Sequence, residues 1–184
     1  MLVEDAIYRR HTTIEFSEKL VLPHMINLIV KQALQTSTFN NRYNFKVIIL
    51  EHDSKQKFGI VNILNKYGKS NSDIKSEQES KYISAASALI LLYKEKSNDK
   101  DQEKNDLITI GGLGQNISLL ATNYFLGTLW IDSIRNIEDQ VNKIVKIDNN
   151  MELCYGICLG YRDRKTSYKV DSVPMGNFVE TYWR

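Results

Sequence analysis

Basic and hydroxyl side chains form two clusters near opposite ends of this 184-residue sequence. The first is Arg10, His11 and Thr12, and the second is Arg162, Arg164 and Lys165. An arginine guanidinium presents several fixed N–H donors to an oxyanion, so Arg10 and its neighbours could bind a phosphate. Each cluster alone has a plainer explanation, because arginines at a helix end complement the helix dipole and charged turns are common on surfaces. One phosphate would explain both clusters if the fold brings them together.

The elements that must position these clusters are organised around residues 107–132. Apolar residues recur there at intervals of three and four, the period of a helix buried along one broad stripe. They are Ile110, Leu113, Ile117, Leu120, Ala121 and Tyr124. Gly111, Gly112 and Gly114 would let another backbone or a flat ligand approach the helix start, and Gly127 would end the helix in a left-handed conformation. A buried helix that binds nothing is the simplest interpretation.

Gly112 and Gly114 also resemble the opening of the Gly-x-Gly-x-x-Gly fingerprint that binds dinucleotides on a strand-to-helix turn. Ile117 stands where the third glycine belongs. The residues that follow are too few for the remaining βαβ units, which take roughly 30 residues or more each. We therefore expect no dinucleotide-binding fold of this kind.

Composition narrows the class of protein. Hydrophobic residues at 42% and charged residues at 25% are typical of a soluble globular protein, and the net charge of +2 gives no general case for nucleic acid or an anionic membrane surface. The longest apolar run, residues 85–93, is far shorter than a membrane span of about 20 residues, and acids occupy the position of a signal-peptide core. We expect one domain over residues 1–184, cytoplasmic, with no membrane or nucleic-acid partner.

The two cysteines, Cys154 and Cys158, fall in a predicted strand. Four residues of strand span roughly 13 Å, well beyond the roughly 7 Å limit for a disulfide, so they should not pair with each other. None of the three histidines is near them in sequence, so neither a zinc site nor a Cys-His nucleophile is predicted. Both thiols are expected in the core.

The remaining patterns predict a set of helices and strands. Helices are expected over residues 4–10, from Pro23 to about residue 35, over 55–67 and over 134–145, and strands over 44–50, 85–93 and 152–159. Residues 68–81 show no clear periodicity. The charged run 94–106 is typical of a solvated loop, and residues 177–183 alternate as an edge strand does.

The order of these parts resembles the nitroreductase family of FMN-dependent oxidoreductases. Arg10, His11, Thr12 and Phe16 match the family's first motif, with Ile14 where relatives carry a basic residue. Its second motif is matched by Ser37, Thr38 and Asn40, with Arg42 at the usual glutamine and Tyr43 at the aromatic.

Three later segments extend this resemblance over nearly the whole chain. The central helix matches at Gln115, Asn116, Leu119 and Ala121, and the segment after it at Leu126, Gly127, Thr128, Trp130 and Ile131. Gly160 and Tyr161 match a Gly-Tyr-Pro turn, with Arg162 at the proline. The family then carries a Lys-x-Arg pair, for which this chain has Lys165 and Ser167, so the arginine is absent unless Arg162 or Arg164 substitutes for it.

The resemblance implies an α+β fold, in which a mainly antiparallel sheet has helices on both faces. It also implies an intertwined homodimer with FMN at the subunit interface. Arg10, His11, Thr12, Arg162, Arg164 and Lys165 would come from one subunit, and Ser37, Thr38 and Asn40, with Arg42 in the same loop, from the other. Trp130, Ile131, Asp132 and Ser133 would run beside the flavin ring, and a backbone N–H near Asp132 or Ser133 would donate to N5. Tail residues 177–184 would pack on the partner subunit.

The implied chemistry belongs to the flavin. A hydride from NAD(P)H would pass through flavin N5 to a nitroaromatic, a quinone or a similar small acceptor by a ping-pong mechanism, while the protein supplies orientation and electrostatics. No side chain acts as an obligatory acid or base, and no metal is involved. Because Ile14 puts no cation near the reduced, anionic ring, we expect a lower flavin reduction potential than in relatives with Lys or Arg there, unless Lys66 or Lys69 reaches the same edge.

Two alternatives stay open at this point. Ile14, the altered Arg42-Tyr43 loop and the missing arginine are also what a flavin-binding or partner-binding protein with weak or no turnover would show. Another chemistry on the same fold, such as reductive dehalogenation or flavin fragmentation, is equally compatible with these motifs.

Overall fold

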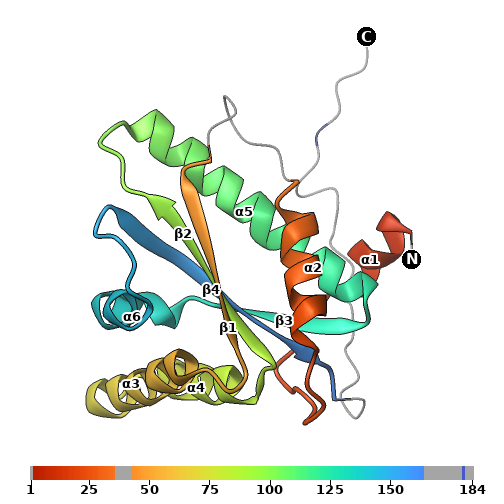
Figure 1. Ribbon diagram of the computed structural model, residues 1–184, viewed down its shortest axis with the longest axis horizontal. Helices are drawn as coiled ribbons and strands as arrows, with labels where there is room; N and C mark the ends of the chain where they lie inside the picture. Colours follow the sequence, from red (N-terminus) through yellow and green to blue (C-terminus); the bar gives the residue numbers. More distant parts are fainter. Residues whose placement is uncertain (1, 36–42, 164–179, 181–184) are drawn as a thin grey trace.

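A four-stranded antiparallel sheet lies between two layers of helices (Figure 1). The fold comes from a computed structural model, which describes residues 2–35, 43–163 and 180. The strands are β1 (Phe45–Glu51), β2 (Ala88–Glu95), β3 (Leu126–Ile131) and β4 (Met151–Tyr161), in the spatial order β1-β2-β4-β3. Each strand is antiparallel to its neighbours. The predicted α+β class and the mainly antiparallel sheet are therefore confirmed.

The helices divide between the two faces of the sheet (Figure 1). One layer contains α1 (Val3–Arg9), α2 (Pro23–Ala33) and the long α5 (Lys100–Asn123). The other contains α3 (Lys55–Asn71), α4 (Ile74–Ala85), the 3-10 helix η2 (Ser133–Ile137) and α6 (Glu138–Val145). Two apolar clusters fill the spaces between sheet and helices, one against α2 and α5 and one against α3, α4 and α6.

The central helix packs through the stripe that its spacing predicts. Ile110, Leu113, Ile117 and Ala121 are buried against the sheet. The helix ends at Asn123, however, and the left-handed residue is Phe125 (φ 61°), not Gly127. Gly127 lies within β3, a strand that the sequence did not reveal.

Irregular pairing in β4 explains the position of the two cysteines. Leu92 pairs with Tyr155 but Tyr93 with Leu153, so Cys154 is an extra residue in a β-bulge. The bulge reverses the alternation of side chains, and Cys154 and Cys158 belong to different core clusters. Both thiols are free and buried, as predicted, and burial raises the pKa of Cys154 to about 11.

One polar segment contains helices that its pattern did not predict. Most of residues 68–81, where no periodicity was visible, belongs to the end of α3 and to α4. Three of the four buried positions of α4 are polar (Ser76, Glu79 and Ser80), so its inner face leaves no apolar stripe in the sequence. Asp73 caps the helix by accepting a hydrogen bond from the Ser76 N–H at 3.2 Å.

The charged run 94–106 was expected to be a solvated loop, and this expectation was wrong for most of its residues. Lys94 and Glu95 end β2, and α5 begins at Lys100 behind its N-cap Asp99. The Lys94 side chain is 1% exposed and lies 2.7 Å from Glu152 Oε2 and 3.7 Å from Glu103 Oε1. A run of charged residues usually indicates a solvated loop. Here the run begins with the end of β2 and continues into the first turns of α5, and Lys94 pairs with Glu152 of β4 and with Glu103 of α5.

Candidate functional site

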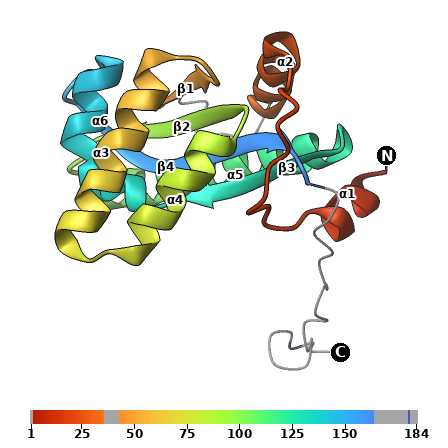
Figure 2. The same ribbon diagram turned by 90° about the horizontal axis from the view of Figure 1, so that it is seen from below.

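The chain segment after α1 runs along the β3 edge of the sheet (Figure 2). Thr12 bridges Thr128 of β3, and the Thr13 N–H donates to the Thr128 carbonyl at 2.9 Å. Farther along, Phe16 bridges Arg162 just beyond β4. The first basic cluster therefore lies beside β3. Arg162 of the second cluster follows β4 directly and lies beside the same segment.

Glycine at position 127 allows this close approach. A Cβ atom built on Gly127 would lie 2.7 Å from the Cβ atom of Thr13. The Thr13 side chain is fully buried, and its hydroxyl has no hydrogen-bond partner among the described residues. Any side chain at residue 127 would push the segment that carries His11 and Thr12 away from the sheet.

The two basic clusters meet at His11 and Arg162. Nη1 of Arg162 lies 3.2 Å from Nε2 and 3.4 Å from Nδ1 of His11. The Nε and Nη2 groups of Arg162 each donate to the Leu126 carbonyl at 3.3 Å. The guanidinium is thus anchored by the first residue of β3 and faces the imidazole.

The imidazole of His11 is biased toward its neutral form. Burial lowers its pKa, and the positive charge of Arg162 lowers it further. Nδ1 lies 2.9 Å from the Arg9 carbonyl oxygen, so in the neutral ring Nδ1 carries the proton and Nε2 accepts from Arg162. Arg10 is half-buried and Thr12 exposed on either side of it. Arginine, not histidine, supplies the positive charge here.

At the other end of β3, Trp130 and Ile131 point to opposite faces of the sheet. Trp130 donates from Nε1 to Ser118 Oγ at 3.1 Å and stacks edge-on against Tyr155, whereas Ile131 is buried in the cluster beneath α3 and α4. A Cβ on Gly114 would lie 2.7 Å from Trp130 Cζ2. The glycine thus makes room for an indole of this chain, whereas the sequence had left open a backbone or a flat ligand.

Asp132 and Ser133 are held by α4. Lys75 Nζ lies 2.5 Å from Asp132 Oδ1, and Glu79 Oε2 accepts from both the Ser133 N–H at 3.1 Å and the Ser133 hydroxyl at 2.5 Å. The Ser133 N–H is therefore engaged inside the protein. Of the two N–H groups expected near flavin N5, that of Asp132 is left, and the carboxylate of the same residue interacts with it.

Lys75 and Glu79 are site residues that the sequence interpretation missed. They lie in the segment without apolar periodicity, yet two signals were available: Asp73 followed by Ser76 as a helix start, and a Lys-Glu pair four residues apart. Lys66 and Lys69, named as substitutes for a cation at residue 14, are exposed residues of α3. The cations that the structure places at the end of β3 are Lys75 and Arg135, whose Nε donates to the Asp132 carbonyl at 3.4 Å.

Several expected site residues lie outside the described part of the chain. They are Ser37, Thr38, Asn40 and Arg42 in one segment, and Arg164, Lys165, Ser167 and nearly all of the tail 177–184 in another. Within the described ranges, no group of three or more His, Cys, Asp or Glu residues is arranged to hold a metal ion. None of the described helices has the length and apolar character needed to cross a membrane.

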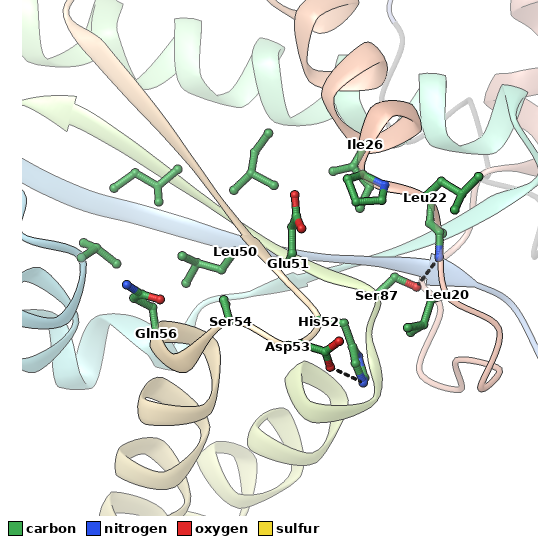
Figure 3. Close-up of a pocket in the computed structure, with 15 residues that line it drawn as sticks. Leu20, Leu22, Ile26, Leu50, Glu51, His52, Asp53, Ser54, Gln56 and Ser87 are labelled. Atoms are coloured by element: carbon green, nitrogen blue, oxygen red, sulfur yellow. Dashed lines mark hydrogen bonds and ion pairs between the residues drawn. The ribbon is translucent and has the colours of Figure 1, made fainter.

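A pocket of about 730 Å³ lies away from these residues, beside β1 (Figure 3). Its walls are residues 20–23 and 26, the end of β1, and the turn His52–Ser54. His52 Nε2 lies 3.8 Å from Asp53 Oδ1, and His52 Nδ1 lies 3.3 Å from the Ala86 carbonyl oxygen. Among the residues that the structure describes, none that is expected to bind cofactor lines this pocket, and we leave it out of the candidate site.

The sequence matches the profile of the Nitroreductase family over residues 7–161. The chain belongs to the nitroreductase family. This confirms the resemblance drawn from its motifs, and the match spans the basic segment, the central helix and all four strands. No curated protein matches the chain significantly.

Solved structures share this nitroreductase fold at low sequence identity. A nitroreductase-like family protein from Bacillus cereus aligns with a TM-score of 0.83 at 16% identity, covering 99% of this chain and 96% of its own. An FMN- and NADPH-dependent nitroreductase from Sphigopyxis sp. strain HMH aligns at 0.82 and 12% identity over 100% of both chains. An NADPH:FMN oxidoreductase from Vibrio harveyi, solved with NAD+, aligns at 0.78 and 16% identity over 99% of this chain and 78% of its own.

Proposed function

We propose that this nitroreductase is an FMN-dependent oxidoreductase that takes reducing equivalents from NAD(P)H and passes them to a small acceptor such as a nitroaromatic or a quinone. The observation that carries the proposal is the meeting of His11 and Arg162 beside β3. Family membership gives the class of cofactor. The candidate site has the positive charge of Arg162 near the start of β3 and the polar turn Asp132–Ser133 after the end of the same strand.

The donor set at the cationic end fits a phosphate. Arg162 offers fixed N–H donors, Arg10 precedes His11, and the exposed Thr12 hydroxyl follows it. Neutral His11 would orient the Arg162 guanidinium by accepting one of its N–H groups. We assign Arg10, His11, Thr12 and Arg162 to the FMN phosphate, with Arg164 and Lys165 continuing the same basic segment.

The segment from Trp130 to Ser133 would lie beside the flavin ring. Bound FMN supplies the hydride chemistry between NAD(P)H and the acceptor. This chain supplies position: Trp130 and Ile131 fix the strand end by packing on the two faces of the sheet, and Lys75 and Glu79 hold the turn that follows. No side chain of the site is required to transfer a proton.

We further propose that the active form is a homodimer in which Ser37, Thr38, Asn40 and Arg42 of one subunit complete the site of the other. Apolar side chains on α1 are unusually exposed: Leu2 and Val3 at 72%, Tyr8 at 75% and Ile7 at 54%. A groove of about 430 Å³ lies beside them between α1, α2 and α5. Exposed apolar surface of this kind marks protein interaction sites.

The visible absorption spectrum of the purified protein tests the proposed function. A yellow protein that releases FMN on denaturation and bleaches with anaerobic NADH or NADPH is the expected result. A colourless protein that cannot be reconstituted with FMN would refute the proposal.

One observation favours a second candidate, a flavin- or partner-binding protein with weak turnover. The Arg162 guanidinium already gives two N–H groups to the Leu126 carbonyl, which leaves fewer for a phosphate. Ile14 is also 41% exposed where a cation would help the reduced ring. Flavin that binds but is not bleached by NADH or NADPH would favour this candidate.

A further inference from the structure

Lys75 and Glu79, one turn apart on α4, contact the two residues that follow β3, Asp132 and Ser133. Lys75 Nζ lies 2.5 Å from Asp132 Oδ1 and 4.0 Å from Glu79 Oε1. Glu79 Oε2 accepts from the Ser133 N–H at 3.1 Å and from its hydroxyl at 2.5 Å. We call Lys75 and Glu79, with Asp132 and Ser133, the α4 brace.

We propose that Lys75 and Glu79 are positioning residues, which fix the Asp132–Ser133 turn against the flavin ring and set the charge beside it. The inference rests on the proposed FMN function and assigns two residues that no motif of the sequence identified. It also gives this chain a cation near the ring, carried by α4 in the absence of one at residue 14.

Burial makes the Glu79 contacts strong enough to define the turn. Glu79 is 7% exposed and Ser133 is 5% exposed, and a buried carboxylate is retained only when hydrogen bonds or a counter-charge replace its lost hydration. Burial raises the pKa of Glu79, and the two Ser133 hydrogen bonds oppose that rise. Because one carboxylate oxygen holds both the N–H and the hydroxyl of Ser133, the backbone at residue 133 has little freedom to rotate.

The charges around Glu79 act in opposite directions. Lys75 is a cation on the solvent side, with its side chain 59% exposed, and Asp132 is an anion beside it. Lys57 and Cys158 lie on the core side, where Glu79 interacts with the Cys158 thiol and Lys57 donates to the carbonyls of Ser84 and Ala86. Asp132 and Glu79 therefore place two carboxylates at the end of β3, with the Lys75 ammonium within 4.0 Å of both and the Arg135 guanidinium donating to the Asp132 carbonyl at 3.4 Å.

A second contact between α4 and the residues after β3 supports the positioning role of the α4 brace. Asp73, the N-cap of α4, accepts from Asn136 Nδ2 at 3.3 Å, and Asn136 belongs to η2 just beyond Ser133. The first turns of α4 and the residues 132–136 thus form one hydrogen-bonded unit. A displacement of α4 would move the Asp132 N–H with it.

Opposite charge changes provide the test. The midpoint potential of bound FMN is measured at pH 8 for the wild type, Glu79→Gln and Lys75→Met. Gln keeps an oxygen acceptor for Ser133 but removes a negative charge, so the potential should rise because the reduced anionic ring is better tolerated. Lys75→Met removes the cation that lies 2.5 Å from the Asp132 carboxylate and leaves Arg135 as the remaining cation beside that residue, so the potential should fall.

Matched controls lie on the same helix. Glu77→Gln and Lys81→Met make the same chemical changes at positions away from residues 132 and 133, and the FMN potential should stay at the wild-type value in both. Lys75 and Lys81 are exposed, so this pair remains informative even if a change at buried Glu79 impairs folding. A general loss of stability would not shift the two brace variants in opposite directions.

Glu79→Ala adds a test of position. It removes the acceptor for both Ser133 groups and should weaken FMN binding at least about tenfold, the scale of losing one hydrogen bond to a charged group, while Glu79→Gln stays within about threefold of wild type. If the brace variants keep the wild-type potential and affinity while the wild type binds FMN, the brace proposal is wrong and the proposed function stands. A wild type that binds no FMN overturns both.

Discussion

The two edges of the sheet differ in the chain segments and side chains that lie beside them. At the β3 edge, residues 12–16 run beside the strand, and Arg162 from beyond β4 closes on His11. At the β1 edge a pocket of about 730 Å³ is lined by an imidazole and a carboxylate, His52 and Asp53, but, within the described part of the chain, by none of the basic residues expected to bind cofactor. The pocket and the meeting point of the two basic clusters are at opposite edges of the sheet. Cavity volume and the expected phosphate-binding residues therefore point to different edges.

The contrast has a physical origin in the edge strands themselves. β3 contains Gly127, where the absence of a side chain lets Thr13 approach. Its first residue is Leu126, whose carbonyl accepts hydrogen bonds from Arg162. The polar groups of the pocket beside β1 lie mainly in the turn after the strand, where His52 already contacts the Ala86 carbonyl. If FMN binds at the β3 edge, substitutions there should change flavin binding and the same kinds of change at the β1 edge should not.

The largest effect is expected from Gly127→Ala. The added Cβ would meet the Thr13 side chain, and overpacking of this kind costs roughly 1–3 kcal/mol. The variant should lower the free energy of unfolding in urea by that amount and lose bound FMN, because the segment carrying His11 is displaced. Gly111→Ala is the control: its Cβ meets nothing within 4 Å, so helix propensity should stabilise the protein by roughly 0.5–1 kcal/mol.

Arg162→Ala should come next. Loss of one hydrogen bond to a charged group costs roughly 1.5–3 kcal/mol, so the dissociation constant for FMN, measured by fluorescence titration, should rise by about 10- to 100-fold. His52→Ala at the β1 edge should leave that constant unchanged. Equal effects of the two substitutions would abolish the distinction between the edges.

A smaller effect is expected from Ile14→Lys, which places a cation on the segment beside β3. A charge near the surface at several ångströms from the reduced ring is worth roughly 1–2 kcal/mol, so the midpoint potential of bound FMN should rise. Phe58→Lys makes a similar change at an exposed position of α3 and should not alter the potential. If Ile14→Lys produces no rise, residue 14 does not face the ring.

The smallest effect concerns pH. Burial and Arg162 lower the pKa of His11 below its unfolded value of about 6.5, so the unfolded chain binds the proton more readily. The contribution of neutral His11 to stability is present above that value and is lost as the pH falls through it toward the folded pKa. Between pH 7.5 and 5.5 the wild type should lose more unfolding free energy than His11→Asn. Parallel losses in the two proteins would contradict this assignment.

Much of the fold could be predicted because its elements follow apolar periodicity. The stripe of α5 and the runs of β2 and β4 are buried as their spacing indicates, and the apolar run of β1 forms the expected strand at the sheet edge. β3 escaped prediction because its six residues adjoin a long helix and contain a glycine, which weakens a strand pattern. α4 escaped because its inner face carries Ser76, Glu79 and Ser80, whose burial depends on hydrogen bonds that periodicity does not register.

The sequence by itself determined the family, the α+β class and the identity of the two basic clusters, since residue types and their order are visible without coordinates. Only the tertiary structure decided that His11 and Arg162, 151 residues apart, lie in contact. It also decided that the Glu79 carboxylate accepts a hydrogen bond from the Ser133 N–H. Contacts across such separations depend on strand register and on which faces pack together, and these are set by the whole core, not by any local pattern.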